Sequence, residues 1–223
     1  MAKSAAMKLY TYYRSTAAFR VRITLNIKGV AYESIPLHLR NGEHHRADYL
    51  QVNPQALIPA LDDDGVVISQ SLAIIEYLEE KFPHPPLLPK ATADRAHVRS
   101  MALNVAADMH PLNNLRVLNF LRTPLGHDEA TINETWYRNW IASGFRGLEE
   151  QAKRFTGDGK HMFGTSLTMA DVLILPQMYN ALRFHCDVTS YPTLRRICAH
   201  LESLPPFIKA APDLQPDSEQ AIV

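Results

Sequence analysis

The stretch "YYRSTAAFRVRITLNIKG" (residues 12–29) decides the fold of the first part of this chain. It starts as the end of an aromatic strand, turns at Arg14, and continues as a helix that stops before Gly29. Ser15 or Thr16 suits the N-cap of that helix, and glycine commonly follows the last helical turn. A helix N-terminus at such a turn is a ready site for an anion. This turn supplies two hydroxyls and an arginine but no cysteine, so it raises the question of what it acts on.

The flanking segments extend this unit into a small α/β domain. We expect strands at 7–13 and 30–37, a hairpin at 57–70 with an Asp-Gly turn, and helices at 43–53 and 71–82. The order β-α-β-α-β-β-α matches the thioredoxin arrangement, and the sequence predicts a thioredoxin-like domain over residues 7–83. We expect the ordered chain to begin at Met7, with residues 1–6 as an extension.

A run of prolines separates this domain from a helical one. "PHPPLLPKATA" (83–93) excludes a helix, and we interpret residues 84–93 as a linker. Apolar periodicity then predicts helices near 94–122, 128–155, 169–185 and 192–204. The fold class is therefore α/β plus all-α, with an all-helical domain over 94–212. The polar tail, 213–223, is expected to be loosely held.

One motif in the helical part has a structural explanation. "LTMAD" (167–171) places Thr168 at an N-cap and Asp171 three residues later, which is the capping-box pattern. We interpret Asp171 as a cap rather than as a catalytic acid. Pro176 inside the following apolar segment predicts a kink or a helix boundary.

Composition excludes several classes of function. The 223 residues carry 23 basic and 23 acidic side chains, so the net charge is zero, which argues against binding to nucleic acid or anionic lipid. No segment approaches the ~20 apolar residues of a membrane span, and the N-terminus lacks a secretory signal. The histidines show no zinc-binding spacing, so we expect no metal. Two unpaired cysteines, Cys186 and Cys198, suit a reducing cytoplasm.

Several stretches together resemble a known family. "YYRSTAAFRVRITLNIKGVAYE", "NPQALIPAL", "QSLAIIEYLEE", "HPLNNLRVL" and "RFHCDVTSYP" occur in the order found in cytosolic glutathione transferases of the zeta class. That class includes maleylacetoacetate and maleylpyruvate isomerases. The resemblance covers nearly the whole chain, from about Lys8 to about Pro212, with one departure: the usual Ser-Ser-Cys reads Ser15-Thr16-Ala17 here.

The resemblance implies that glutathione is the cofactor and supplies the missing thiol. Ser15 would then stabilise the thiolate, Ile58 before a cis Pro59 would pair with the peptide backbone, and Gln70-Ser71 would bind the γ-glutamyl carboxylate. The full set implied for glutathione is Ser15, Thr16, Gln55, Ile58, Pro59, Gln70, Ser71, His110 and Asn114. Ser15 remains open to a simpler interpretation as a plain N-cap, which it could combine with the thiolate role if Thr16 provided the cap.

The resemblance also implies a substrate that carries carboxylates. Arg14, Arg116 and Arg183 match positions that the bacterial relatives use around their substrate, and a guanidinium pairs well with a carboxylate. Ser15 and Arg14 are the expected catalytic residues. Arg20 and Arg22 face different ways on the first helix, and we interpret them as structural or surface charges.

The implied activity is a glutathione-dependent cis-trans isomerisation of maleylacetoacetate to fumarylacetoacetate in aromatic amino-acid catabolism. Alternatives are maleylpyruvate isomerisation in gentisate catabolism, a general glutathione S-transferase, and a scaffold that has lost glutathione. A homodimer is expected from the family alone, with a small dicarboxylate as the other partner and neither nucleic acid nor membrane. The physiological substrate stays open.

Overall fold

The computed structural model describes residues 7–219 and contains two compact units. The first comprises residues 7–85 together with 203–219, and the second comprises residues 86–202. The expected extension at 1–6 and the end of the expected tail, 220–223, lie outside the described residues.

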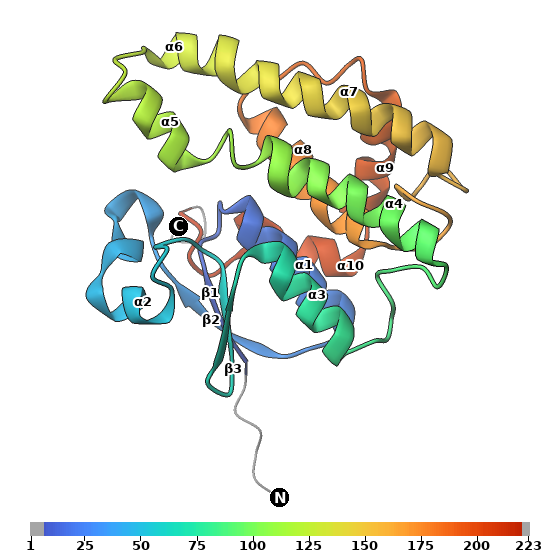
Figure 1. The fold of residues 1–223 in the computed structure, drawn as a ribbon, viewed down its shortest axis with the longest axis horizontal. Coiled ribbons are helices and arrows are strands. Elements are labelled where there is room, and N and C mark those ends of the chain that lie inside the picture. The colour runs from blue at the N-terminus through green and yellow to red at the C-terminus, as the bar shows by residue number, and fades with distance from the viewer. Residues whose placement is uncertain (1–6, 220–223) are drawn as a thin grey trace, which may run out of the picture. The chain divides into compact units, whose positions relative to one another are not determined.

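The first unit is built on a mixed sheet of four strands in the described chain, with the order β2-β1-β3-β4 (Figure 1). The strands are β1 (Met7–Thr11), β2 (Tyr32–Pro36), β3 (Ala60–Asp63) and β4 (Val66–Ser69). β1 and β2 pair in parallel, whereas β3 is antiparallel to both β1 and β4. Leu9 lies opposite Leu61 in the register, and both side chains are fully buried. This order and pairing confirm the predicted thioredoxin-like arrangement.

Helices cover the sheet of the first unit. α1 (Thr16–Lys28) lies against both α3 (Ser71–Lys81) and α10 (Pro205–Ala210), while α2 (Ala47–Val52) lies on the other side of the sheet (Figure 1). An apolar cluster of this unit includes Tyr12, Tyr49 and Ile58. The helix predicted over 43–53 is shorter than expected, because 3₁₀ turns at Leu39–Asn41 (η1) and Glu43–His45 (η2) precede it.

The C-terminal part of the chain differs from its prediction. Residues 203–219 belong to the first unit rather than to the helical domain or to a loose tail. A 3₁₀ turn, η5 (Pro212–Leu214), follows α10, and the Gln215 side chain donates to the carbonyls of Lys209 (3.1 Å) and Ala211 (2.8 Å). These bonds connect the segment to the end of α10.

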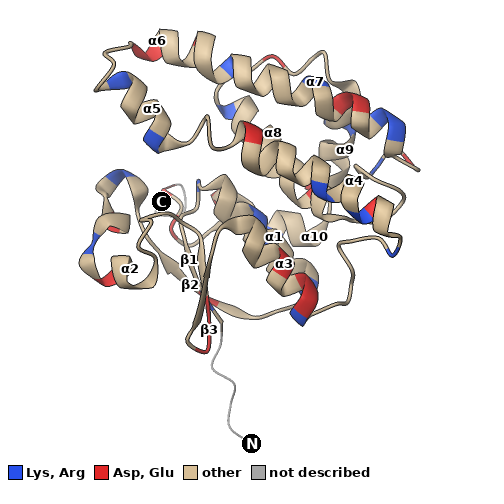
Figure 2. Cartoon of the chain, viewed as in Figure 1, with Lys and Arg blue, Asp and Glu red and all other residues tan. Residues whose placement is uncertain are grey.

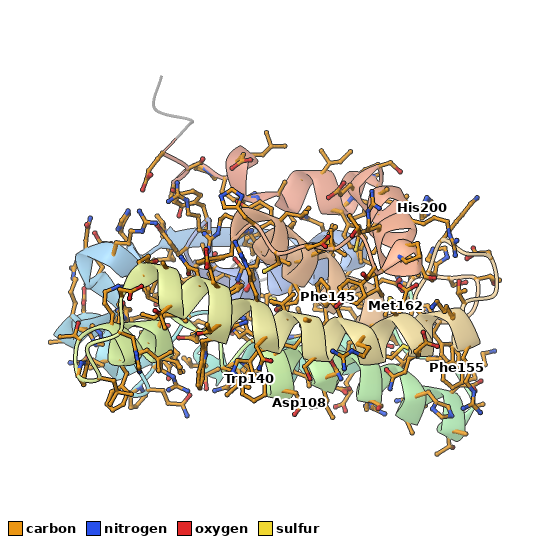
Figure 3. All side chains as sticks on the ribbon, turned by 90° about the horizontal axis from the view of Figure 1, so that it is seen from above. Asp108, Trp140, Phe145, Phe155, Met162 and His200 are labelled. Atoms are coloured by element: carbon orange, nitrogen blue, oxygen red, sulfur yellow. The ribbon has the colours of Figure 1, made fainter. Side chains whose placement is uncertain are left out.

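The named elements of the second unit are all helices or helical turns. These are α4 (Thr92–Leu103), η3 (Asn104–Met109), α5 (Leu115–Arg122), α6 (Glu129–Thr131), η4 (Ile132–Tyr137), α7 (Arg138–Phe155), α8 (Met169–Arg183) and α9 (Pro192–Glu202). η3 and η4 are wider π-type turns within longer helices. Phe145 on α7 and Met162 are completely buried in this unit, and both are labelled in Figure 3.

Two predictions for the second unit have clear outcomes. The single helix expected over 94–122 is interrupted, since η3 ends at Met109 and α5 begins only at Leu115. The structural role of Asp171 is confirmed. Its buried carboxylate accepts from the backbone N–H groups of Thr168 (2.8 Å) and Met162 (2.7 Å) at the start of α8, which continues through Pro176.

Within residues 7–219, no helix is long and apolar enough to cross a membrane.

Candidate active site

Ser15 is the N-cap of α1. Its backbone is extended, and its Oγ accepts a hydrogen bond from the N–H of Ala18 at 3.2 Å. The cap therefore comes from Ser15 itself and not from Thr16, which is buried beside it. A hydroxyl that accepts one bond still has a proton to donate and a second lone pair. Ser15 can thus cap the helix and also donate to an anion at the same N-terminus, where the helix dipole favours negative charge.

Arg14 precedes the cap and is half-buried. Its guanidinium lies 4.9 Å from the centre of the Tyr13 ring, which favours a cation–π contact. Burial raises the pKa of Tyr13 to about 12, so its hydroxyl keeps its proton at neutral pH. The Arg14 guanidinium therefore lies over an uncharged tyrosine ring, in the residue that precedes the cap.

The C-terminal segment reaches this turn. Asp217 Oδ2 accepts from the N–H of Tyr13 at 2.9 Å, and Glu219 Oε2 lies 3.2 Å from Arg14 Nη2. The other Glu219 oxygen lies 3.5 Å from His38 Nε2. Desolvation opposes ionisation of Glu219, but the Tyr13 hydroxyl and the Arg14 charge outweigh it and hold the pKa of this carboxyl below its usual value. Glu219 thus places a carboxylate beside the Arg14 guanidinium.

Residues 57–59, just before β3, have main-chain groups that lie at the edge of the sheet pairing. The Ile58–Pro59 peptide bond is cis, as expected from the sequence. The preceding carbonyl, that of Leu57, accepts from the Tyr49 hydroxyl (2.5 Å) and the Asn53 amide (2.7 Å), which fix the loop. Ile58 lies outside the strand pairing of β1 with β3. Its N–H and C=O therefore fit the predicted pairing with a peptide ligand.

Gln70, Gln55 and Ser71 come together at the start of α3. Gln70 has φ of 70°, a left-handed conformation that is uncommon for a residue with a side chain and often marks a functional site. Its Nε2 donates to Gln55 Oε1 at 3.0 Å. Ser71 is the first residue of α3 and is buried, and the side chain of the N-cap residue Gln70 makes no capping hydrogen bond. The turn therefore presents an uncapped helix N-terminus beside two amides and a hydroxyl.

The remaining predicted residues belong to the second unit. His110 is half-buried just after η3, and Asn114 is the N-cap of α5, where its Oδ1 accepts from the N–H of Arg116 at 3.1 Å. Arg116 is exposed on α5, and Figure 2 shows basic residues along that helix. Arg183 is exposed at the end of α8, 4.8 Å from the centre of the Phe184 ring. Asn114 therefore caps α5, whereas Arg116 and Arg183 have exposed side chains.

Arg20 and Arg22 are not surface charges. Both side chains are buried in α1. Of the two roles expected from the sequence, structural or surface charge, the surface role is therefore wrong. The reason is that α1 is packed between α3 and the returning α10, contacts that bring together residues far apart in the sequence.

The described residues hold no cluster of three or more histidine, cysteine or acidic side chains arranged to bind a metal ion.

Comparison with known proteins identifies the family. Residues 5–80 match the family model described as "Glutathione S-transferase, N-terminal domain". A probable maleylacetoacetate isomerase of Vibrio cholerae is 49% identical over 212 residues, which cover 94% of this chain and 97% of that protein. The chain belongs to the zeta class of glutathione transferases. A maleylpyruvate isomerase of a Ralstonia species is 45% identical over 212 residues, which cover 95% of this chain and 100% of that protein.

Solved structures of zeta-class transferases agree with this assignment. The holo structure of a maleylpyruvate isomerase superposes with a TM-score of 0.92 at 44% identity, over 95% of this chain and 99% of that one. A maleylacetoacetate isomerase from Methylobacterium extorquens, solved with bound malonate and glutathione, gives a TM-score of 0.90 at 40% identity, over 95% and 99%. The predicted fold and family are confirmed.

Three contacts at the candidate site were missed by the sequence analysis. Asp217 and Glu219 reach the turn from the other end of the chain, and no local pattern predicts a contact across about 200 residues. Arg20 donates to the Ser71 hydroxyl. An arginine in a helix that has apolar neighbours on both sides, as in "AFRVRI", was the signal that could have indicated burial.

Proposed function

We propose that this protein is a glutathione-dependent isomerase that converts a cis maleyl compound, maleylacetoacetate, into its trans isomer. The observation that carries the proposal is the Ser15 hydroxyl, which caps α1 and retains a proton to donate at a turn without any cysteine. The relatives of the zeta class described above support the choice of reaction.

The residues of the first unit fit glutathione. The uncapped start of α3 suits the γ-glutamyl carboxylate, with Ser71 and the Gln70–Gln55 pair beside it. The main chain of Ile58 suits the cysteinyl backbone, and the Ser15 hydroxyl suits the sulfur. Bound glutathione would supply a thiolate that adds reversibly to the cis double bond, so that rotation can occur before the thiol leaves. Ala17 leaves the chain with no thiol of its own at this turn.

Ser15 would act on the ionisation of the bound thiol. A free cysteine thiol has a pKa of about 8.5, and lowering it by about two units requires about 2.7 kcal/mol. A charge-assisted hydrogen bond contributes roughly 1.5–3 kcal/mol, and a helix dipole contributes up to about 1 kcal/mol. The hydroxyl and the N-terminus of α1 together supply the required stabilisation.

Arg14 would bind a carboxylate of the substrate and stabilise the negative charge that develops when the double bond is attacked. Arg116 and Arg183 are proposed to bind the remaining carboxylate, which follows from the resemblance and from their exposed charges. His110 and Asn114 are proposed contacts of glutathione, and Thr16 a supporting residue of the turn.

The isomerisation of maleylpyruvate is the second candidate, because a relative with that name is 45% identical over nearly the full length. The two substrates share the maleyl unit and differ beyond it. Turnover of both substrates and of a neutral chloro-aromatic compound, each with and without glutathione, tests the proposal. We expect isomerisation that requires glutathione and little conjugation. Faster conjugation of the chloro-aromatic compound would contradict it and favour a general transferase.

We further propose a homodimer in the cytoplasm that serves aromatic amino-acid catabolism. The dimer is inferred from the family, and light scattering of the purified protein tests it. A gene for homogentisate dioxygenase beside this one would support the pathway, whereas a gentisate dioxygenase gene would favour maleylpyruvate.

A further inference from the structure

The carboxyl ends of two parallel strands meet at one edge of the sheet in the first unit. β1 and β2 pair up to their last residues, and the N–H of Leu37 continues the pairing by donating to the Thr11 carbonyl at 2.8 Å. The chain leaves β1 toward Arg14 and leaves β2 toward η1, which contains Arg40. Ligands commonly bind at such an edge of an α/β sheet, and here two segments bring basic side chains to it.

His38, between β2 and η1, is held with one ring nitrogen free to donate. Its Nδ1 accepts from the N–H of Asn41 at 3.3 Å and so caps η1, and its ring lies edge-on to Tyr12 with the ring centres 5.1 Å apart. An imidazole whose Nδ1 accepts a hydrogen bond carries its proton on Nε2. His38 therefore presents an N–H on its outer nitrogen.

Glu219 places a carboxylate among these side chains. Its Oε2 lies 3.2 Å from Arg14 Nη2, its Oε1 lies 3.5 Å from His38 Nε2, and Arg40 is close enough to act on its charge. Both distances exceed the roughly 2.7–2.9 Å of a strong charge-assisted hydrogen bond. Because the Glu219 side chain is also 47% exposed, these contacts are weak and open to exchange.

Two neighbouring acids engage the backbone instead. Glu43 Oε2 accepts from the N–H of His38 at 2.7 Å, and Asp217 Oδ2 accepts from the N–H of Tyr13 at 2.9 Å. These bonds fix the two segments that carry the basic side chains. Fixed donors around a replaceable carboxylate are expected of a ligand site rather than of an ion pair that stabilises the fold.

We propose that His38 and Arg40 bind, together with Arg14, the carboxylate that stands beside the double bond of a maleyl substrate, and that Glu219 competes with it for these groups. The inference rests on the proposed function and adds two residues that determine its specificity. Two guanidinium groups and a ring N–H suit a carboxylate, which accepts several hydrogen bonds. A neutral electrophile would offer these groups much less, so the cluster selects for an anionic substrate.

Two substitutions test the proposal with little disturbance of the fold. His38→Asn keeps a side-chain oxygen that can cap η1 but removes the outer N–H, and Arg40→Gln removes one exposed charge. Each should raise the KM for maleylacetoacetate about two- to fivefold, and the double variant roughly five- to twentyfold. The kcat should change little, because the carboxylate is bound alike before and during the reaction. Melting temperatures should stay unchanged.

Binding measurements separate the substrate carboxylate from those of glutathione. By calorimetry, the double variant should bind malonate more weakly in the presence of glutathione, by the same factor as the rise in KM, and should bind glutathione itself as the unchanged protein does. Arg46→Gln is the matched control, since it removes an exposed arginine that pairs with Asp48 at 2.8 Å. It should leave the KM and the affinity for malonate unchanged.

A double-mutant cycle tests the competition. Glu219→Gln should strengthen malonate binding less in Arg40→Gln than in the otherwise unchanged protein, because the side chain and the ligand would share the same cation. Equal gains in the two backgrounds would show that Glu219 and the ligand do not compete at Arg40.

Four results would overturn the proposal. An unchanged KM and malonate affinity in the double variant would remove both residues from the site, and an equal loss in Arg46→Gln would reduce the effect to the general charge of the protein. A loss of glutathione affinity would assign the cluster to glutathione. A lower melting temperature of His38→Asn with an unchanged KM would leave His38 only its cap. Absence of isomerisation by the unchanged protein would instead contradict the proposed function, while malonate binding would still report on the cluster.

Discussion

Ser15 can combine the cap that it provides with the proposed contact to a thiolate, because a hydroxyl has separate donor and acceptor capacity. The acceptor side holds the N–H of Ala18, and the donor side remains for a thiolate. The sequence left open whether cap and thiolate roles required two residues. The structure assigns the cap to Ser15, so under the proposed function one side chain would serve both roles, and substitutions must separate them.

Ser15→Ala and Ser15→Gly provide that separation. Alanine at an N-cap costs about 1 kcal/mol of stability, whereas glycine costs only a few tenths of a kcal/mol. Both remove the hydroxyl, so both should raise the pKa of the bound glutathione thiol by about one to two units. The thiolate absorbance as a function of pH measures this, and thermal melts report the cap. An unchanged thiol pKa in Ser15→Gly would exclude the hydroxyl from catalysis.

Glu219 pairs with Arg14, so under the proposed function a substrate carboxylate would compete with it for the guanidinium. Glu219→Gln should therefore strengthen the binding of malonate to the glutathione complex. An exposed ion pair is worth at most about 1 kcal/mol, which corresponds to roughly two- to fivefold in affinity. Asp213→Asn is the matched control, since it removes one negative charge from the same segment away from Arg14. Weaker malonate binding in Glu219→Gln would show that Glu219 orients Arg14 rather than competing for it.

At the scale of elements, local patterns predicted the first unit better than the second. The turn at Ser15, the Gly29 terminus and the hairpin follow from residue types within a few positions. The helix predicted over 94–122 was wrong because its apolar periodicity continues through the break. Pro111 and the N-cap residue Asn114 were the local signals for an interruption there. Before α2, Asn41-Gly42 was a signal of the same kind, since Gly42 ends the first 3₁₀ turn with a φ of 74°.

The start of α8 depends on one carboxylate. Asp171 accepts from two backbone N–H groups and from the Thr168 hydroxyl, all of them buried. Asp171→Asn keeps the shape but can offer only one carbonyl oxygen to these donors, so at least one N–H faces an amide NH₂. We expect a loss of about 1–3 kcal/mol in the free energy of unfolding, measured with urea. Asp158→Asn is a suitable control on the surface, and an equal effect there would contradict the prediction.

At the scale of the whole molecule, the site of the first unit depends on both ends of the chain. From the sequence, we assigned residues 203–212 to the helical domain, which they follow directly in the chain, and residues 213–223 to a tail. The contacts that reassign them join positions about 180 to 200 apart in the chain, such as Asn26 with Pro206 and Tyr13 with Asp217. The burial of Arg20 and Arg22 has the same origin. Periodicity reports only which side of an element is apolar, not which distant element covers it.

This dependence predicts what truncation does. A chain that ends at Ser203 lacks α10 and the segment after it, so α1 loses an apolar partner and the Arg22 guanidinium loses the Ala210 carbonyl. Its first unit should therefore fail to bind glutathione and should melt well below the full chain, as circular dichroism and calorimetry would show. A chain that ends at Glu219 keeps every described contact and should match the full chain in both. If the chain that ends at Ser203 also matched the full chain, α10 would be an accessory to the fold, and the buried bonds of Arg22 would have to be replaceable by water.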